Sequence, residues 1–293
     1  MADHLEPSRR EFLAASALGI LSLAGGAAGR ASREDRELLY VGTYTEDKRT
    51  EGIFLVRMDM RSGALQLAHG VDAGPNPSFL AIHPNGRVLY AVNEIDQLNG
   101  KASGAVCALA IAHDTGALTR INTQASEGGS PCYVSVDRSG RALLVANYVG
   151  GNVALLPLDH SGSLGSARHI DQHQGKGPNT ERQEGPHAHC IVTDRSNRYV
   201  LASDLGLDRI FMYRLDVEGG DLQHIESSDA RMQPGAGPRH IAFHPRLPIV
   251  YVVNELDCSI TTLRFDSERG SLTPIDTRST LPSTWSGSNT GAD

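Results

Sequence analysis

The feature that most constrains the fold is an internal repeat with a period of about fifty residues. Residues 77–94, 131–148, 189–205 and 238–255 align with one another, which puts Asn93, Asn147, Asp204 and Asn254 in one column. These column residues are separated by 54, 57 and 50 residues. Residues 37–44 match the second half of the unit and place Thr43 in the same column. The chain therefore repeats one supersecondary unit.

A second module follows each aligned block. It reads as an alternating strand, a turn that ends in glycine, and a leucine that opens another strand; the leucines are Leu65, Leu118, Leu164, Leu222 and Leu272. Each unit therefore holds four short strands, two around an Asn-Gly or Ser-Gly turn and two around a turn of the form D-x-x-x-G.

Four-stranded antiparallel units repeated at this period are typical of a β-propeller, whose blades pack radially around a channel. The alternatives are a pair of β-sandwiches and a solenoid. A sandwich has no reason to repeat its turn chemistry five times, and the rungs of a parallel β-helix are much shorter. The sequence therefore predicts an all-β fold, a β-propeller of four-stranded antiparallel blades over residues 36–293, with about five blades present.

The last residues, 280–293, resemble a loop between blades followed by the first residues of another inner strand. A propeller closes by pairing its terminal strands, so a chain that stops there leaves an open edge. We therefore expect the chain to be a C-terminally truncated version of a longer protein.

Residues 1–31 differ in character from the repeats. Arg9 and Arg10 precede Phe12, Leu13 and an apolar run of sixteen residues, a layout that is typical of a secretory signal and resembles the twin-arginine signal. The run is too short and too mildly apolar for a good membrane span. A helical N-terminal extension of a cytosolic enzyme is the alternative. We expect the twin-arginine machinery to export the protein to the periplasm or beyond, with no stable membrane anchor.

The composition argues against nucleic-acid partners. A formal charge of −7, with no block of like charges after residue 36, leaves no electrostatic footprint for nucleic acid. The four cysteines, Cys107, Cys132, Cys190 and Cys258, have no C-x-x-C spacing and lie in apolar, strand-like contexts. Because of these contexts we interpret them as buried free thiols. A disulfide is the alternative, and it would need two of these strands to be neighbours.

Candidate functional residues lie where the two inner strands of each blade meet. Antiparallel pairing brings the start of the first strand, after a proline, and the end of the second, at the Asn column, to the same face. Residues at these points therefore converge on one rim of the channel. After the proline stand Ser78, Cys132, His189 and Arg239, and after the Asn column stand Glu94, Tyr148, Leu205 and Glu255.

Four polar residues, His187, His189, Arg239 and Glu255, share one rim of two adjacent blades. A histidine of near-neutral pKa takes a proton from water, an arginine holds an anion or stabilises an oxyanion, and a glutamate orients either one. Such a set could hydrolyse an ester. The structural alternative is that these polar groups satisfy loop backbone at the blade ends.

Other site chemistries have weaker support. His187 and His189, two apart on a strand, could chelate a metal, but zinc needs three or four ligands and His240 in the next blade is the only further candidate. No G-x-S-x-G, H-E-x-x-H or Walker motif is present, and no G-x-G-x-x-G opens a helix.

Several stretches together resemble the lactonase family of seven-bladed propellers, which includes a bacterial 6-phosphogluconolactonase type and a fungal carboxymuconate cycloisomerase. They are YVGTYT with GIFLVRMD, GPNPSFLAIHPNGRVLYAVNE, ERQEGPHAHC, GPRHIAFHP with VYVVNEL, and NTGAD. The resemblance runs from about residue 38 to the end of the chain.

The resemblance implies a lactonase or lactonising enzyme that works at the propeller rim on a small-molecule lactone and needs no metal or other cofactor. The family's proposed site combines a histidine, two arginines and a glutamate. Arg239 and Glu255, sixteen residues apart, fit one arginine and the glutamate, and His187 or His189 fits the histidine. The second arginine is expected in a blade beyond residue 293.

We therefore expect a lactonase that opens a sugar lactone such as 6-phosphogluconolactone, with His187 or His189 activating water and Arg239 and Glu255 assisting. Arg182, in the loop before the histidines, and Asn254 are candidate substrate-binding residues. Because phosphogluconolactone is a cytosolic intermediate, an exported relative is expected to act on another sugar or aromatic lactone. The alternative is a non-catalytic propeller that binds a ligand or protein on the same rim.

Overall fold

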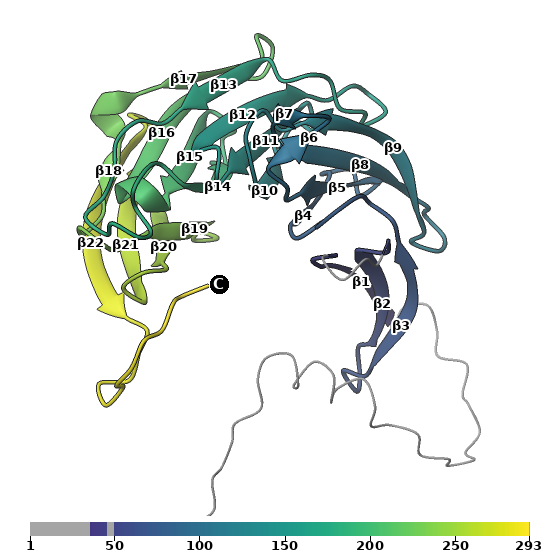
Figure 1. The fold of residues 1–293 in the computed structure, drawn as a ribbon, viewed down its shortest axis with the longest axis horizontal. Helices are drawn as coiled ribbons and strands as arrows, with labels where there is room; N and C mark the ends of the chain where they lie inside the picture. The colour runs from purple at the N-terminus through teal and green to yellow at the C-terminus, as the bar shows by residue number, and fades with distance from the viewer. Residues whose placement is uncertain (1–35, 46–49, 293) are drawn as a thin grey trace, which may run out of the picture. The chain divides into compact units, whose positions relative to one another are not determined.

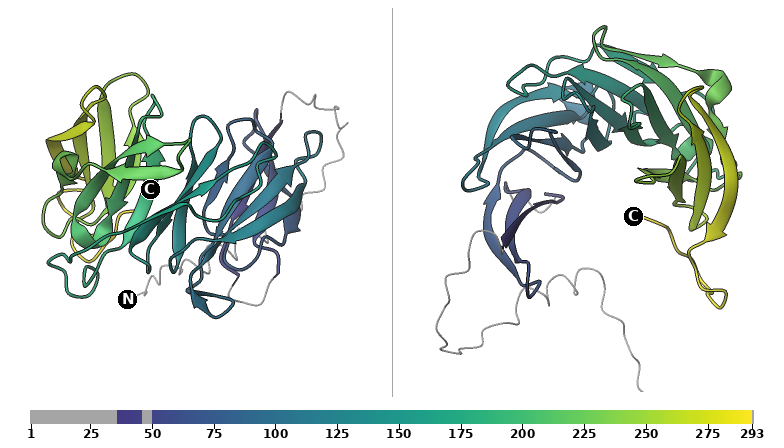
Figure 2. Two further views of the ribbon diagram at one scale, coloured as in Figure 1. Left: turned by 90° about the horizontal axis from the view of Figure 1, so that it is seen from above. Right: turned by 180° about the vertical axis from the view of Figure 1, so that it is seen from behind.

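A computed structural model of the protein describes residues 36–45 and 50–292. The predicted signal, residues 1–31, lies outside these residues. Within residues 37–293 the described chain forms antiparallel sheets that succeed one another around a common centre (Figure 1), and Figure 2 shows the same succession from two further sides. The prediction of an all-β propeller with repeated antiparallel blades is therefore confirmed.

The described sheets follow the repeat, and their strands run in chain order from the centre outwards. The first sheet consists of β1 (Arg36–Gly42), β2 (Ile53–Asp59) and β3 (Leu65–Val71). The second consists of β4 (Leu80–Ile82), β5 (Val88–Asn93), β8 (Ala105–Ile111) and β9 (Leu118–Ala125), and a small hairpin, β6 (Gln97–Leu98) and β7 (Lys101–Ala102), extends from it. The third consists of β10 (Pro131–Val136), β11 (Ala142–Asn147), β12 (Asn152–Pro157) and β13 (His169–Gln172).

The last two described sheets are built in the same way. The fourth consists of β14 (Ala188–Thr193), β15 (Tyr199–Asp204), β16 (Arg209–Asp216) and β17 (Asp221–His224), with β18 (Ala230–Arg231) also paired to β16. The fifth consists of β19 (Pro238–Phe243), β20 (Ile249–Asn254), β21 (Ser259–Asp266) and β22 (Ser271–Ser279). Two 3-10 helices, η2 (Leu205–Leu207) and η3 (Glu226–Ser228), connect strands of the fourth. No helix in the described ranges is long and apolar enough to cross a membrane.

The core lies between neighbouring sheets. Side chains on a strand alternate between its two faces, so a sheet with a neighbour on each face buries both sets. In β11, Leu143 and Val145 pack with Val92 of the preceding sheet, while Leu144 packs with Val200 of the following one. All six residues of β11 are buried as a result. A continuous apolar run in the second strand of each repeat is therefore what radial packing requires.

The D-x-x-x-G turns close the outer hairpins. The amide of Gly63 donates to the carbonyl of Asp59, and that of Gly270 donates to the carbonyl of Asp266, each at 2.8 Å. Both glycines have positive φ, 71° and 64°, a conformation that costs glycine nothing sterically. This requirement accounts for the glycine at the end of each turn in the repeat.

The Asn-column residues end the second strand of their sheets and hold the rim backbone in place. Asn93 Nδ2 donates to the carbonyls of Ala73 and Pro75, each at 2.9 Å. Asp204 Oδ1 accepts from the amide of His187 at 2.8 Å, and its Oδ2 lies 2.6 Å from His173 Nδ1. These side chains are buried, so the column positions the loops at the inner ends of the blades.

The four cysteines lie in the described chain as free thiols, and Cys107, Cys190 and Cys258 are buried. Cys132 is half-buried.

Candidate active site at the inner ends of the blades

The inner strands of three consecutive sheets carry a β-bulge at the same place. In β10 the pairing shifts by one residue at Cys132, and in β14 it shifts at His189. In β19 the regular pairs are Pro238 with Asn254 and Ile241 with Val252. Two residues of β19, Arg239 and His240, therefore lie opposite a single residue of β20. A bulge leaves the extra residue outside the regular alternation and re-aims its side chain. Each repeat therefore directs a different side chain towards the centre.

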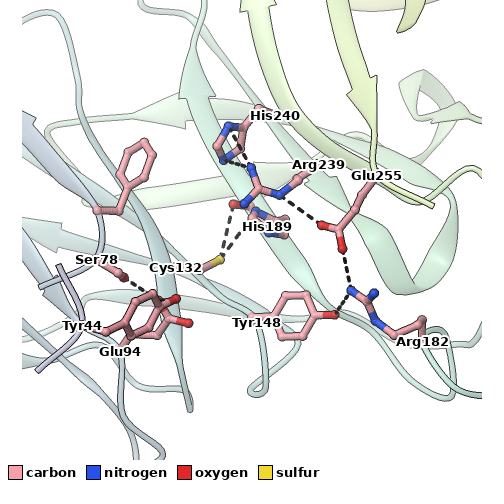
Figure 3. A pocket seen from close by; sticks show the side chains of 11 residues that line it. Tyr44, Ser78, Glu94, Cys132, Tyr148, Arg182, His189, Arg239, His240 and Glu255 are labelled. Atoms are coloured by element: carbon pink, nitrogen blue, oxygen red, sulfur yellow. Dashed lines mark hydrogen bonds and ion pairs between the residues drawn. The ribbon is translucent and has the colours of Figure 1, made fainter. Parts of the chain in front are cut away.

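These side chains line a pocket of about 590 Å³ (Figure 3). Its lining consists of Tyr44, Ser78, Phe79, Glu94, Cys132, Tyr148, Arg182, His189, Arg239, His240 and Glu255. They come from the ends of the first strands, from the positions after the Asn column, and from the loop before β14. The pocket is therefore built by all five described sheets and their rim loops.

A carboxylate shared by two arginines forms one end of the pocket. Glu255 Oε2 accepts a hydrogen bond from Arg239 Nε at 3.1 Å, and Oε1 accepts from Arg182 Nη2 at 2.7 Å. Arg239 Nη1 also donates to the carbonyl of Ala292 at 2.7 Å. Arg239 Nη1 also lies 3.3 Å from His240 Nε2, so this guanidinium contacts two side chains of the pocket lining.

His189 lies in the middle of the pocket wall and is 7% exposed. Its Nδ1 is 3.8 Å from Cys132 Sγ, and its ring meets those of Tyr148 and His240 edge-on. Burial holds the pKa of His189 well below the ordinary value for histidine, and the charges of Arg239 and His240 lower it further. The imidazole is therefore neutral at neutral pH.

Burial also favours the neutral form of the thiol beside it, although here it raises the pKa. The pKa of Cys132 lies well above its usual value, first because burial disfavours the thiolate and then because Glu94 is negative. Cys132 is therefore a neutral thiol and a weak nucleophile.

His187 lies behind Tyr148 and is not part of the pocket lining. Its ring stacks on Tyr148 with centroids 4.5 Å apart, and its Nδ1 is 3.0 Å from the Tyr148 carbonyl. Its Nε2 is 3.1 Å from Glu184 Oε1. Tyr148 Oη in turn accepts a hydrogen bond from Arg182 at 3.2 Å. His187 therefore contacts a pocket residue without lining the pocket itself.

The sequence-predicted residues divide into two groups. His189, Arg239, Glu255 and Arg182 lie together around the pocket. Asn254 is fully buried, and its Nδ2 donates to Ser259 Oγ and Thr261 Oγ1 inside the blade. Whereas the second arginine was expected beyond residue 293, Arg182 is a second arginine beside Glu255 in the described pocket.

The repeat alignment placed Ser78, Glu94, Cys132 and Tyr148 at the rim, and His240 was considered as a metal ligand, but none of them was chosen for the catalytic set. Tyr44 and Phe79 also line the pocket and were not singled out from the sequence. Most of these pocket residues occupy the repeat columns of Arg239, His240 and Glu255, because Ser78 and Cys132 follow the proline and Glu94 and Tyr148 follow the Asn column. Membership of those columns in any blade, and not only in the two adjacent blades that carry the histidines and Arg239, was therefore the signal for a pocket residue. Among residues 36–45 and 50–292, no group of three or more His, Cys, Asp and Glu side chains is arranged to hold a metal ion.

Comparison with known proteins identifies the family of this chain. A family model described as "Lactonase, 7-bladed beta-propeller" matches residues 38–293. The 6-phosphogluconolactonase of Bacillus subtilis is 37% identical over 253 residues, which cover 86% of this chain and 69% of that protein. The 6-phosphogluconolactonase of Formosa agariphila is 31% identical over 76% of this chain and 63% of its own length.

A solved structure agrees with these relatives. The periplasmic gluconolactonase of Pseudomonas aeruginosa superimposes with a TM-score of 0.78 at 30% identity, over 87% of this chain and 71% of that one. The chain thus spans between 63% and 71% of the length of these three proteins. The family match covers the propeller repeats and the pocket they build, so the chain belongs to the lactonase family of seven-bladed β-propellers.

Proposed function

We propose that the protein hydrolyses a lactone to the open-chain hydroxy acid, with His189 as general base, Arg239 and Arg182 as electrophilic partners, and Glu255 as the group that orients them. The observation that carries the proposal is the convergence of a neutral histidine and a Glu255-bridged arginine pair on one pocket. The relatives named 6-phosphogluconolactonase and gluconolactonase support a sugar lactone as the substrate class.

The first step adds water to the lactone carbonyl. The neutral imidazole of His189 accepts one proton from a water molecule as the water oxygen bonds to the carbonyl carbon. The lowered pKa supports this role because it keeps the base unprotonated at neutral pH. Negative charge develops on the carbonyl oxygen, which the guanidinium of Arg239 in the pocket lining stabilises by a hydrogen bond.

The second step opens the ring. The tetrahedral intermediate collapses, the bond between the carbonyl carbon and the ring oxygen breaks, and the imidazolium of His189 returns its proton to the departing oxygen. The product carboxylic acid then ionises and leaves as a carboxylate. Glu255 keeps the guanidinium of Arg239 oriented throughout by its bond to Nε, and Arg182 shares the charge of the same carboxylate.

The proposal extends to the location of the protein. The paired Arg9 and Arg10 before an apolar run support export by the twin-arginine route, and a periplasmic gluconolactonase is among its structural neighbours. Fractionation of cells that express the whole chain tests it. Replacing both arginines by lysine is expected to leave the protein in the cytoplasm, and unchanged periplasmic recovery of that variant would reject this route.

Lactone hydrolysis measured by pH-stat tests the activity. D-Glucono-1,5-lactone, its 6-phosphate, δ-valerolactone and dihydrocoumarin are compared with their spontaneous rates. His189→Ala is expected to lower kcat/KM by about 100-fold or more, as removal of a general base does. His113→Ala, at a fully exposed histidine, is the matched control and keeps the wild-type rate. If the wild-type protein accelerates none of the four lactones, the lactonase proposal fails.

A further inference from the structure

The end of the pocket opposite the arginines carries a second carboxylate with different partners. Glu94 follows β5, at the repeat position that Glu255 occupies after β20. Its Oε2 accepts hydrogen bonds from Tyr44 Oη at 2.8 Å and from Ser78 Oγ. Figure 3 shows these three side chains together, on the other side of Cys132 and Tyr148 from Arg182, Arg239 and Glu255.

Among the described residues, Glu94 has no arginine partner of the kind that pairs with Glu255. Glu255 is paired with two guanidinium groups, whereas Glu94 is bonded by two neutral hydroxyls among the described residues. Its Oε1 accepts no hydrogen bond from the described chain, although the residue is half-buried in the pocket wall. A half-buried carboxylate oxygen without a partner is a strong acceptor for a ligand hydroxyl.

The neighbours of Glu94 preserve that acceptor character. The pKa of Tyr44 is raised, first by burial and then by its hydrogen bond to Glu94, so the phenol stays neutral and keeps donating to the carboxylate. Ser78 Oγ donates its hydrogen to Glu94, so within the pocket lining this hydroxyl can only accept a further hydrogen bond. The subsite therefore offers acceptors to a ligand, and no cation of the described chain is bonded to it.

The two ends of the pocket differ in charge. Arg182 and Arg239 occupy the end where the carbonyl oxygen of a lactone becomes negative, which leaves the ring substituents to face Glu94. A hydroxyl substituent donates a hydrogen bond to Glu94, but a phosphate or carboxylate meets a like charge in a partly desolvated site. The geometry thus favours neutral, hydroxyl-bearing rings over anionic ones.

We propose that Glu94, Ser78 and Tyr44 form a subsite that binds hydroxyl groups of an uncharged, polyhydroxylated lactone and discriminates against lactones that carry a phosphate or carboxylate. This inference rests on the proposed lactonase function and names its substrate class. A purely structural role for the trio, in which Tyr44 ties the loop after β1 to the second sheet, is the competing interpretation.

Kinetics with Glu94→Gln separates the two interpretations, because the amide keeps the shape of the side chain and removes its charge. For D-glucono-1,5-lactone we expect KM to rise about tenfold with kcat within threefold, the loss of a hydrogen bond to a charged group. For δ-valerolactone, which has no hydroxyls, kcat/KM is expected to stay within twofold of wild type. The 6-phosphate should gain about tenfold relative to the neutral lactone. Glu218→Gln, at an exposed glutamate outside the pocket, is the control.

A binding measurement makes the subsite testable without turnover. D-Glucono-1,5-lactam, which resists hydrolysis, is titrated calorimetrically into wild type and Glu94→Gln, and we expect about tenfold weaker binding to the variant. If Glu94→Gln fails to fold, Ser78→Ala and Tyr44→Phe are expected to weaken lactam binding by several-fold each, in the same direction.

The outcomes distinguish this inference from the lactonase proposal. If no lactone is hydrolysed but Glu94→Gln still weakens lactam binding, the lactonase proposal fails and the subsite stands. If lactones are hydrolysed with the 6-phosphate preferred by the wild-type protein, the subsite is wrong and the lactonase proposal stands. Equal losses on all three lactones, or unchanged lactam binding in a folded variant, assign the trio a structural role.

Discussion

Arg182 Nη2 lies 2.7 Å from Glu255 Oε1, although 73 residues separate the two in the chain. Arg182 belongs to the loop before β14, and Glu255 follows β20 in the next sheet. The same carboxylate also binds Arg239 of its own hairpin. One glutamate therefore couples the loop of the fourth sheet to the inner strand of the fifth, and it orients both arginines of the pocket.

This coupling predicts non-additive kinetics for Arg182 and Glu255. Each single variant, Arg182→Ala and Glu255→Gln, is expected to lower kcat/KM by about 100-fold, because displacing a positioned catalytic group by about 1 Å has effects of this size. The double variant should lose little more than the worse single one, because both changes break one unit. The exposed pair Arg141 and Glu218 provides the control, since Arg141→Ala and Glu218→Gln should each leave the rate unchanged. Multiplicative losses at Arg182 and Glu255 would contradict the shared role.

The lowered pKa of His189 predicts a rate that does not fall near pH 6.5. The base stays neutral down to well below the ordinary histidine pKa, so kcat/KM should be level between pH 6 and 8 and should decline only in more acidic solution. A pH profile of lactone hydrolysis, corrected for the spontaneous rate, checks this. An inflection of the rate near pH 6.5 would contradict the lowered pKa of His189.

The same shift predicts a pH dependence of stability with a definite sign. Below about pH 6.5 the unfolded chain protonates His189 while the folded chain does not, so the unfolded state binds more protons and the free energy of unfolding falls as pH decreases. Above that pH the contribution is complete and level. Urea unfolding of His189→Phe should show a weaker loss between pH 7 and pH 5 than the wild type. If the free energy of unfolding of the variant falls as much as that of the wild type, or more, His189 is not the source of the pH dependence.

The positions of the two neighbouring histidines predict unequal effects on activity. His187→Phe retains the stack on Tyr148 and loses the polar contacts to the Tyr148 carbonyl and Glu184, so kcat/KM should stay within about tenfold of wild type. His189→Phe removes the proposed base and should cost about 100-fold or more. Measuring kcat/KM of the two variants at one pH decides which histidine is the base. A larger loss in His187→Phe than in His189→Phe would assign the catalytic role to His187.

Asp204 is expected to contribute more to stability than an aspartate at an exposed turn, such as Asp216. Its carboxylate is fully buried, pairs with His173, and accepts from the amides of His187 and Leu207. Asp204→Ala leaves these groups without partners and should lower the free energy of unfolding by about 3–5 kcal/mol. Asp216→Ala, which removes an exposed acceptor of the Gly219 amide, should cost about 1 kcal/mol. Denaturant unfolding of both variants measures the difference.

Within a blade, the sequence was informative because its contacts are local. Arg239 and Glu255 flank one hairpin, and the antiparallel register pairs Pro238 with Asn254, so their proximity follows from the strand pattern. The same reasoning covers Ser78 and Glu94, which flank the hairpin of β4 and β5. The repeat period and the turn glycines determined the blade, its strands and its rim.

The choice between His187 and His189 could not be read from spacing. Regular alternation would point both side chains the same way, but β14 begins at Ala188 and bulges at His189. His187 therefore packs behind Tyr148, while His189 faces the pocket. A bulge inserts one residue and reverses the alternation beyond it, which no period-two pattern reveals.

The sequence by itself determined the repeated blade, the buried second strands, and the columns from which rim residues come, because hydrogen-bond register and side-chain alternation act over a few residues. Only the tertiary structure decided which members of those columns share one cavity. The pairing of Arg182 with Glu255, the burial that lowers the pKa of His189, and the Glu94 end of the pocket all arise from packing between sheets. That packing depends on the complementary fit of side chains far apart in the chain.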